Sequence, residues 1–162
     1  VDVGVHYNDW VGDNALTVPV GNVAPEVLHL LAVTEESLHI AIDHARDGHM
    51  LGDLSHSVEA HVTQHGYSVV RELVGHGVGQ QMHEDPQVPN YAEPGRGPRL
   101  AEGMVLAIEP MVNAGKAGVK VLSDGWTAVT RDRSLSAHFE HTVAVTGEGP
   151  RVLTRPARVL VP

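Results

Sequence analysis

The sequence predicts an α+β fold in which strands precede and follow two helices along the chain. Apolar residues alternate with other residues from Val1 onward, as in a strand with one covered face. Between residues 25 and 66 the apolar spacing becomes helical, and beyond residue 67 short strand-like runs return, separated by Gly and Pro. No linker, repeat or low-complexity tract interrupts the 162 residues, so a single domain over 1–162 is expected.

The first two strand-like runs, residues 1–7 and 10–20, are expected to form a hairpin around a two-residue turn. Such a turn fixes the register, with Asp2 opposite Ala15. Asp2 and Asp13 then become diagonal neighbours on one face of the hairpin. The register therefore predicts a pair of carboxylates close together.

The helices and later strands are predicted from the spacing of apolar residues and from the positions of Gly, Pro and Asp. One helix is expected from Pro25 to a stop at Gly48, and a second from an Asp53 cap to Gly66. A strand is expected over 67–73, followed by a long Gly/Pro-rich connection over 75–99. Further short strands are expected near residues 104–112, 118–122, 126–131, 137–146 and 151–154.

Composition and charge exclude several function classes. The 20 acidic residues outnumber the 11 Lys and Arg and give a net charge of −9, which argues against binding to nucleic acid or anionic membranes. The absence of Cys excludes disulfides, thiolate zinc sites and cysteine nucleophiles. No apolar stretch or leader pattern suggests a membrane span or secretion, so a soluble intracellular protein is expected.

The general catalytic motifs are missing. The sequence has no Gly-x-Ser-x-Gly elbow and no phosphate-binding loop, and His83-Glu84 lacks the second His of a zinc helix. What remains is a set of acidic and imidazole side chains among small or apolar neighbours: Asp2, Asp13, His76, Glu109 and Glu140. Each carboxylate alone is more simply explained by solvent or an ion pair. If all five converge, they suit two divalent cations in the range of Mn, Fe, Co or Zn.

Three runs closely resemble the bacterial type I methionine aminopeptidases, which have the pita-bread fold: GHGVGQQMHEDPQVPNY, GMVLAIEPMVNAG and DGWTAVTRDRSLSAHFEHTVAVT. The resemblance extends from Val1 to about Thr154. It implies a pita-bread (creatinase/aminopeptidase) fold and two divalent metal ions held by the five residues above. In that ligand set Asp13 and Glu140 bridge the ions.

The same resemblance implies removal of the N-terminal methionine from nascent polypeptides, by attack of a metal-bridging water on the first peptide bond. Glu109 would be the general base, and His83 would stabilise the tetrahedral intermediate by a hydrogen bond. Trp126 would line the methionine pocket, and Met82 stands there in place of the family's usual Phe. Without the resemblance, His83 can be interpreted as a turn residue and Trp126 as a core aromatic.

Two other features near these motifs are expected to be structural. Gly75 and Gly77 would let the backbone bend closely around His76. Asp132 and Arg133 would form an ion pair near the site.

The resemblance also sets the partners and the alternatives. The expected partners are polypeptides that begin with Met, with the ribosome as a further partner, and the protein is expected to be a cytoplasmic monomer. One alternative is an X-Pro aminopeptidase or prolidase of the same fold, although the RDRSLSAHFEHT run is typical of the methionine enzymes. The other is a pita-bread module that binds polypeptides without catalysis.

The start of the chain within a strand predicts that the family's N-terminal segment is missing. Asp2 would then lie next to a charged α-amino group, which would compete with a cation for its carboxylate. Weak metal occupancy and poor or no activity are therefore expected for this chain alone.

Overall fold

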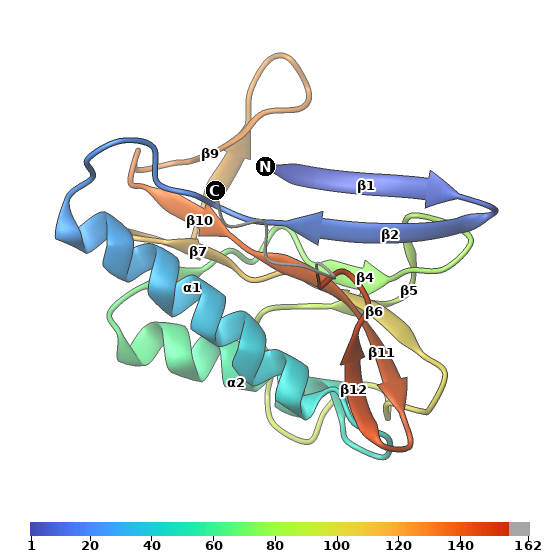
Figure 1. The fold of residues 1–162 in the computed structure, drawn as a ribbon. Helices are drawn as coiled ribbons and strands as arrows, with labels where there is room; N and C mark the ends of the chain where they lie inside the picture. Colours follow the sequence, from blue (N-terminus) through green and yellow to red (C-terminus); the bar gives the residue numbers. More distant parts are fainter. Residues whose placement is uncertain (156–162) are drawn as a thin grey trace.

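The computed structural model describes residues 1–155, which form a curved sheet covered on one face by two helices (Figure 1). The helices are α1 (Pro25–His44) and α2 (Leu51–Gln64). The main sheet has the order β1-β2-β11-β6-β4-β5, with β12 paired to β11. Its strands are β1 (Asp2–Tyr7), β2 (Trp10–Ala15), β4 (Gly75–Gly77), β5 (Glu84–Val88), β6 (Val105–Ile108), β11 (Glu140–Thr146) and β12 (Gly149–Val152).

Two smaller sheets complete the fold. The first has the order β10-β7-β3, and the second is the hairpin β8-β9, which projects from the body of the molecule (Figure 1). Their strands are β3 (Ser68–Val69), β7 (Met111–Asn113), β8 (Val119–Val121), β9 (Ala128–Thr130) and β10 (Ser136–His138). None of the helices in the described part of the chain is long and apolar enough to cross a membrane.

The main core lies between the helix pair and the sheet. It is aliphatic, with Leu30 and Leu38 from α1, Val58 from α2, and Leu106 and Val143 from the sheet, all buried. Because Leu106 and Val143 alternate with Ala107 and Thr142 along their strands, the latter two side chains point to the opposite face. The helices therefore cover one face of the sheet and leave the other available for a site.

The hairpin prediction is confirmed in its register. Asp2 pairs with Ala15 and Gly4 pairs with Asp13. The turn residues Asn8 and Asp9 have φ angles of 46° and 64°, the left-handed values that a two-residue hairpin turn of this kind needs. The second strand ends at Ala15, earlier than residue 20.

The prediction for the start of the second helix was wrong. Helix α2 begins at Leu51 with Met50 as its N-cap residue, so Asp53 lies within the first turn. The Asp53 carboxylate instead accepts a hydrogen bond of 2.7 Å from the backbone N–H of Gly95. Asp53, a residue type that favours the N-cap position, therefore binds the distant loop around Gly95 instead of capping α2.

The long connection expected over 75–99 contains strands β4 and β5. The strand expected over 67–73 is reduced to the two residues of β3. Strand β4 reads Gly-His-Gly, and β5 carries Glu, Asp and Pro, so neither has the β-branched composition of a strand. Strands β4 and β5 are extended because they pair with each other and because β4 also pairs with β6, which is a tertiary effect.

Candidate metal centre

The sheet register places three predicted ligands on one face. In an antiparallel sheet directly opposed residues share a face, as do residues two apart on one strand. Ala15 of β2 is opposed by Asp2 on one side and by Glu140 on the other. Asp13 lies two residues before Ala15, so its side chain points the same way.

The other two ligands reach the same face through β6. His76 is opposed to Ala107, and Ala107 is opposed to Thr142, two residues after Glu140. Glu109 follows Ala107 by two positions, immediately beyond the end of β6. All five residues therefore point to the face of the sheet that the helices leave open.

Three of the five are already close enough to share an ion. Asp13, His76 and Glu140 are buried, and each offers a ligand atom within 4.8 Å of the others. The Nε2 atom of His76 is 3.8 Å from Oδ2 of Asp13 and 3.6 Å from Oε1 of Glu109. Asp2 is exposed on the edge strand, where its charge still acts on Glu140.

The charges of this cluster are not neutralised by protein cations. Burial, followed by the carboxylates of Glu109, Asp13 and Asp2, raises the pKa of Glu140 to about 9. Among the described residues, no Lys or Arg forms an ion pair with any of these carboxylates. A bound divalent cation would supply the missing positive charge.

The tautomer of His76 fits a metal ligand. Its Nδ1 atom is 2.9 Å from the carbonyl oxygen of Gly77. A carbonyl can only accept, so Nδ1 carries a proton, and Nε2 is the ring nitrogen that faces Asp13 and Glu109. Metal-binding histidines usually have such a second hydrogen bond. Together with the oxygen donors, this set fits Mn, Fe, Co or Zn.

The glycines around His76 are required by close packing. A Cβ atom on Gly75 would collide with the carbonyl oxygen of Ala107, and one on Gly77 would collide with that of Asp85. These contacts bring β4 tightly between β5 and β6. The expectation that glycine lets the backbone pass closely at His76 is confirmed at both positions.

Two further predicted residues lie beside the cluster. The ring of His83 is 4.4 Å from that of His76 in an edge-to-face arrangement, and both line a pocket of about 640 Å³. A Cβ atom on Gly4 would collide with the terminal methyl of Met82 and would lie 3.6 Å from Oδ1 of Asp13. His83 thus lies beside the ligand His76, and Met82 lies against Gly4 near Asp13.

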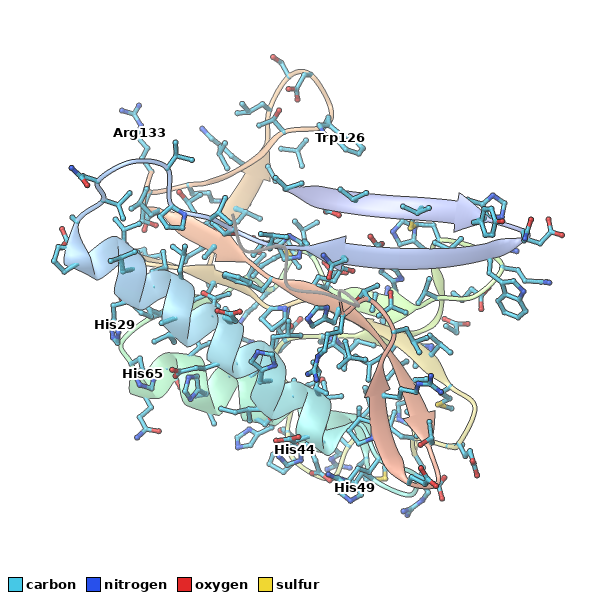
Figure 2. The ribbon with its side chains drawn as sticks, in the orientation of Figure 1. His29, His44, His49, His65, Trp126 and Arg133 are labelled. Atoms are coloured by element: carbon cyan, nitrogen blue, oxygen red, sulfur yellow. The ribbon has the colours of Figure 1, made fainter. Side chains whose placement is uncertain are left out.

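Trp126 lies apart from this group. It is 89% exposed on the loop that joins β8 and β9 in the projecting hairpin (Figure 2). Its backbone N–H donates to the carboxylate of Asp124, which shapes the turn. The alternative interpretation of Trp126 as a core aromatic is therefore wrong.

The expected ion pair between Asp132 and Arg133 is not formed. Asp132 instead accepts hydrogen bonds from the backbone N–H of Lys116 at 2.7 Å and from the side chain of Ser134 at 2.7 Å. Arg133 has a φ angle of 67°, in the left-handed region.

Sequence reasoning missed two residues that the structure brings to the site. The Nε2 atom of His138 is 3.5 Å from Oε2 of Glu109. The hydroxyl of Thr142 accepts from the N–H of Asp13 at 2.8 Å and donates to the Asp13 carbonyl at 2.7 Å. Both lie two residues from Glu140, so strand alternation around Glu140 was the available signal.

The α-amino group of Val1 donates to the carbonyl oxygen of Leu16 at 2.9 Å. Among the described residues it forms no ion pair with Asp2. The expected competition between this ammonium group and a cation for Asp2 has therefore no counterpart in the structure.

Comparison with known proteins places this arrangement in a family. Residues 1–147 match Metallopeptidase family M24. Methionine aminopeptidase 1 of Bacillus subtilis is 54% identical over 155 residues, which cover 96% of this chain and 62% of the relative. The crystal structure of methionine aminopeptidase from Thermotoga maritima superposes with a TM-score of 0.94 at 49% identity, covering 96% of this chain and 62% of that one.

A prolidase from Pyrococcus furiosus is more distant, with a TM-score of 0.76 and 26% identity over 97% of this chain and 41% of that one. The likeness to these structures confirms the pita-bread fold, and this chain spans 62% of the length of the bacterial relatives named above. The family match over most of the sequence shows that the chain belongs to metallopeptidase family M24.

Proposed function

We propose that residues 1–162 are a catalytic metallopeptidase domain that removes the N-terminal methionine from polypeptides. The observation that carries the proposal is the convergence of Asp13, His76 and Glu140 within 4.8 Å, with Glu109 beside them. The 54% identity to a methionine aminopeptidase supports methionine as the specificity. The lower identity of 26% to a prolidase makes cleavage before proline the weaker alternative.

Membership of a metallopeptidase family implies use of a divalent metal ion. We propose two ions, of Co, Mn, Fe or Zn, with Asp2, Asp13, His76, Glu109 and Glu140 as ligands and with Asp13 and Glu140 shared between them. Ions bound there would lower the pKa of water at the site and polarise the scissile carbonyl. The protein side chains perform the remaining steps.

Glu109 is the proposed general base. Its carboxylate lies between two imidazoles, with Oε1 3.6 Å from His76 and Oε2 3.5 Å from His138. The side-chain amide of Asn90 donates a hydrogen bond of 3.1 Å to the backbone carbonyl of Glu109, which fixes the turn after β6. Held by these contacts, Glu109 would take a proton from the attacking water and return it to the leaving amine.

His83 and Met82 would act on the substrate itself. The exposed imidazole of His83 borders the His76 pocket and would donate a hydrogen bond to the developing oxyanion. Met82, a flexible thioether against Gly4, would contact the methionine side chain. Trp126 is proposed to close that pocket from the β8-β9 loop.

The proposed partners are polypeptides that begin with Met, presented as they leave the ribosome. A cytoplasmic monomer is the proposed state of the protein. The net charge of −9 is consistent with the absence of a direct nucleic-acid contact.

A pair of peptides tests the proposal. The purified protein, supplied with Mn²⁺, is assayed on Met-Ala-Ser and on Ala-Pro-Ser, and the ratio of the two rates is measured. We expect Met-Ala-Ser to be cleaved at least about tenfold faster, and Glu109→Gln to lower that rate by about 10² or more. Glu26→Gln on the exposed face of α1 is the matched control and should leave the rate unchanged.

Each contrary result has a distinct meaning. Faster cleavage of Ala-Pro-Ser would replace the proposed specificity with that of an X-Pro aminopeptidase. Neither peptide cleaved, with no Mn²⁺ uptake by calorimetry, would leave a polypeptide-binding module.

A further inference from the structure

A second cluster of imidazoles lies on the helix pair, remote from the acidic face. His29 comes from α1, His61 from the last turn of α2, and His65 from the C-cap of α2. Figure 2 shows His29 and His65 beside each other at one end of the two helices. The ring centres of His61 and His65 are 4.6 Å apart, and those of His29 and His65 are 5.7 Å apart.

These separations suit imidazoles that share one ion. A tetrahedral Zn²⁺ with Zn–N distances of about 2.1 Å holds the centres of two imidazole rings about 5 Å apart. The two measured distances lie on either side of that value. His61 and His65 are four residues apart on a helix, the spacing that brings two side chains to the same side.

The tautomer of His65 is set for metal binding. Its Nδ1 atom is 2.9 Å from the carbonyl oxygen of His61. Since that oxygen can only accept, Nδ1 carries a proton, and Nε2 is the nitrogen that could bind a metal. A backbone carbonyl that fixes one ring nitrogen while the other stays available is the usual arrangement in metal-binding histidines.

His61 has a buried ring nitrogen that the protein does not satisfy. Its Nε2 atom is buried and has no hydrogen-bond partner among the described residues. It lies 3.4 Å from Oε2 of Glu36, a contact whose geometry is not that of a hydrogen bond. Burial and the neighbouring His65 lower the pKa of His61 while Glu36 opposes them, so the neutral, metal-binding form is favoured at neutral pH.

We propose that His29, His61 and His65 bind one Zn²⁺ ion, with the Glu36 carboxylate as the fourth ligand. Three imidazoles and one carboxylate form a set that Zn²⁺ prefers. In the described part of the chain only Asp13, His76 and Glu140 have their donors already within 4.8 Å. His29 and Glu36 are exposed, so rotation of their side chains can close the second site.

This site is separate from the candidate metal centre. The helices pack on the face of the sheet that carries Leu106 and Val143, whereas Glu140 and His76 point to the opposite face. Its loss is therefore expected to leave the acidic centre intact. The inference is independent of the proposed aminopeptidase activity.

Zinc binding is measured on the metal-free protein by equilibrium dialysis and, in parallel, by NMR of the histidine rings. We expect the rings of His29, His61 and His65 to shift with Zn²⁺ in a step distinct from that of His76. His65→Ala and His29→Ala should each weaken this step by about tenfold or more, while the His76 step stays unchanged. His56→Ala, which removes another imidazole from α2, is the control and should change neither step.

Both substituted positions are exposed, so the metal-free variants should unfold at the same temperature as the parent protein. The proposal is overturned if Zn²⁺ shifts only His76, or if His65→Ala binds as much Zn²⁺ as the parent protein. An equal loss on His56→Ala would also overturn it, because the uptake would then come from scattered surface imidazoles.

Discussion

Glu140 is a buried carboxyl group surrounded by other carboxylates in the candidate metal centre. It is 2% exposed, and burial together with three neighbouring carboxylates raises its pKa to about 9. Without metal, the folded chain therefore keeps a proton on Glu140 at neutral pH. A cation must displace that proton, so metal binding releases protons and strengthens as the pH rises toward 9.

The substitution Glu140→Gln tests this account. A glutamine is nearly the same shape as the protonated side chain, so the metal-free variant should unfold within about 1 kcal/mol of the parent protein at pH 7. Its Mn²⁺ affinity should fall by about tenfold or more in calorimetry, because a proposed carboxylate ligand is lost. Glu148→Gln, at an exposed turn, is the control. Unchanged Mn²⁺ affinity in Glu140→Gln would remove Glu140 from the ligand set.

The pKa of Asp132 is shifted in the opposite direction, below its ordinary value. The N–H of Lys116, then the side chain and N–H of Ser134, hold the pKa of this carboxyl at about 2, below its ordinary 3.8. A carboxyl whose pKa is lower in the folded state stabilises fully above the ordinary value, and the effect is lost as the pH falls through about 2.

We therefore expect Asp132→Asn to flatten the acid limb of the stability curve. The free energy of unfolding of the parent protein should decrease between about pH 4 and pH 2, and that of the variant should decrease less. Urea titrations at several pH values measure both curves. Parallel curves would show that the hydrogen bonds of Asp132 do not persist in solution.

At the scale of elements, the hairpin β1-β2 depends on a narrow attachment. Strand β2 pairs with β11 only at Ala15–Glu140 and Asn14–His141. Beyond these pairs the Thr142 hydroxyl bonds to both the N–H and the carbonyl of Asp13. A side chain therefore continues the ladder at the point where a proposed ligand is held.

Thr142→Val should loosen this attachment. The valine has the same shape but leaves the buried N–H and carbonyl of Asp13 without their partner, at a cost of about 1–3 kcal/mol. Urea unfolding measures the loss. Thr63→Val, at the exposed end of α2, should cost less than about 0.5 kcal/mol. Equal losses in the two variants would contradict the role given to the Thr142 hydroxyl.

Strand β4 illustrates a different constraint, because it passes between β5 and β6 with no space for side chains at its glycines. Gly77→Ala should destabilise the protein by about 1–3 kcal/mol, since its Cβ meets the Asp85 carbonyl. Gly12→Ala on β2 is a matched control with nothing within 4 Å of the new methyl group. Both substitutions reduce the backbone freedom of the unfolded chain, so the difference between their free energies of unfolding reports the packing cost at Gly77. Chemical unfolding measures both.

At the scale of the whole molecule, the charge of −9 and the site on the open face of the sheet are linked. The carboxyl groups gathered on that face disfavour the ionisation of Glu140, and a bound cation removes this conflict only in the folded state. Stability and metal binding are therefore thermodynamically coupled.

Mn²⁺ is expected to stabilise the folded chain. At a concentration 100 times its Kd, one bound ion adds about 2.7 kcal/mol to the free energy of unfolding. Thermal unfolding with and without Mn²⁺ measures the effect, and EDTA should reverse it. Mn²⁺ is chosen because it prefers oxygen donors over the imidazoles of the helix pair. An unfolding temperature independent of Mn²⁺ would contradict the coupling.

Features of the fold that depend on local sequence were predicted, and those that depend on distant partners were not. The presence of the two helices and the register of the hairpin were predicted well, because helical spacing and a two-residue turn are local features. Strands β4 and β5 were missed, since Gly-His-Gly and a Pro-containing segment become extended only through pairing with neighbours. Asp53 was mistaken for a cap because its partner, Gly95, is 42 residues away.

The sequence by itself determined the family, the fold class and five candidate ligands, because long motifs and strand alternation are written in the order of residues. Only the tertiary structure decided which of those side chains meet. The distances between Asp13, His76 and Glu140, the bonds of Thr142 and the contact of His138 with Glu109 join segments far apart in the chain. The common environment of His29, His61 and His65 likewise arises only from the packing of α1 against α2.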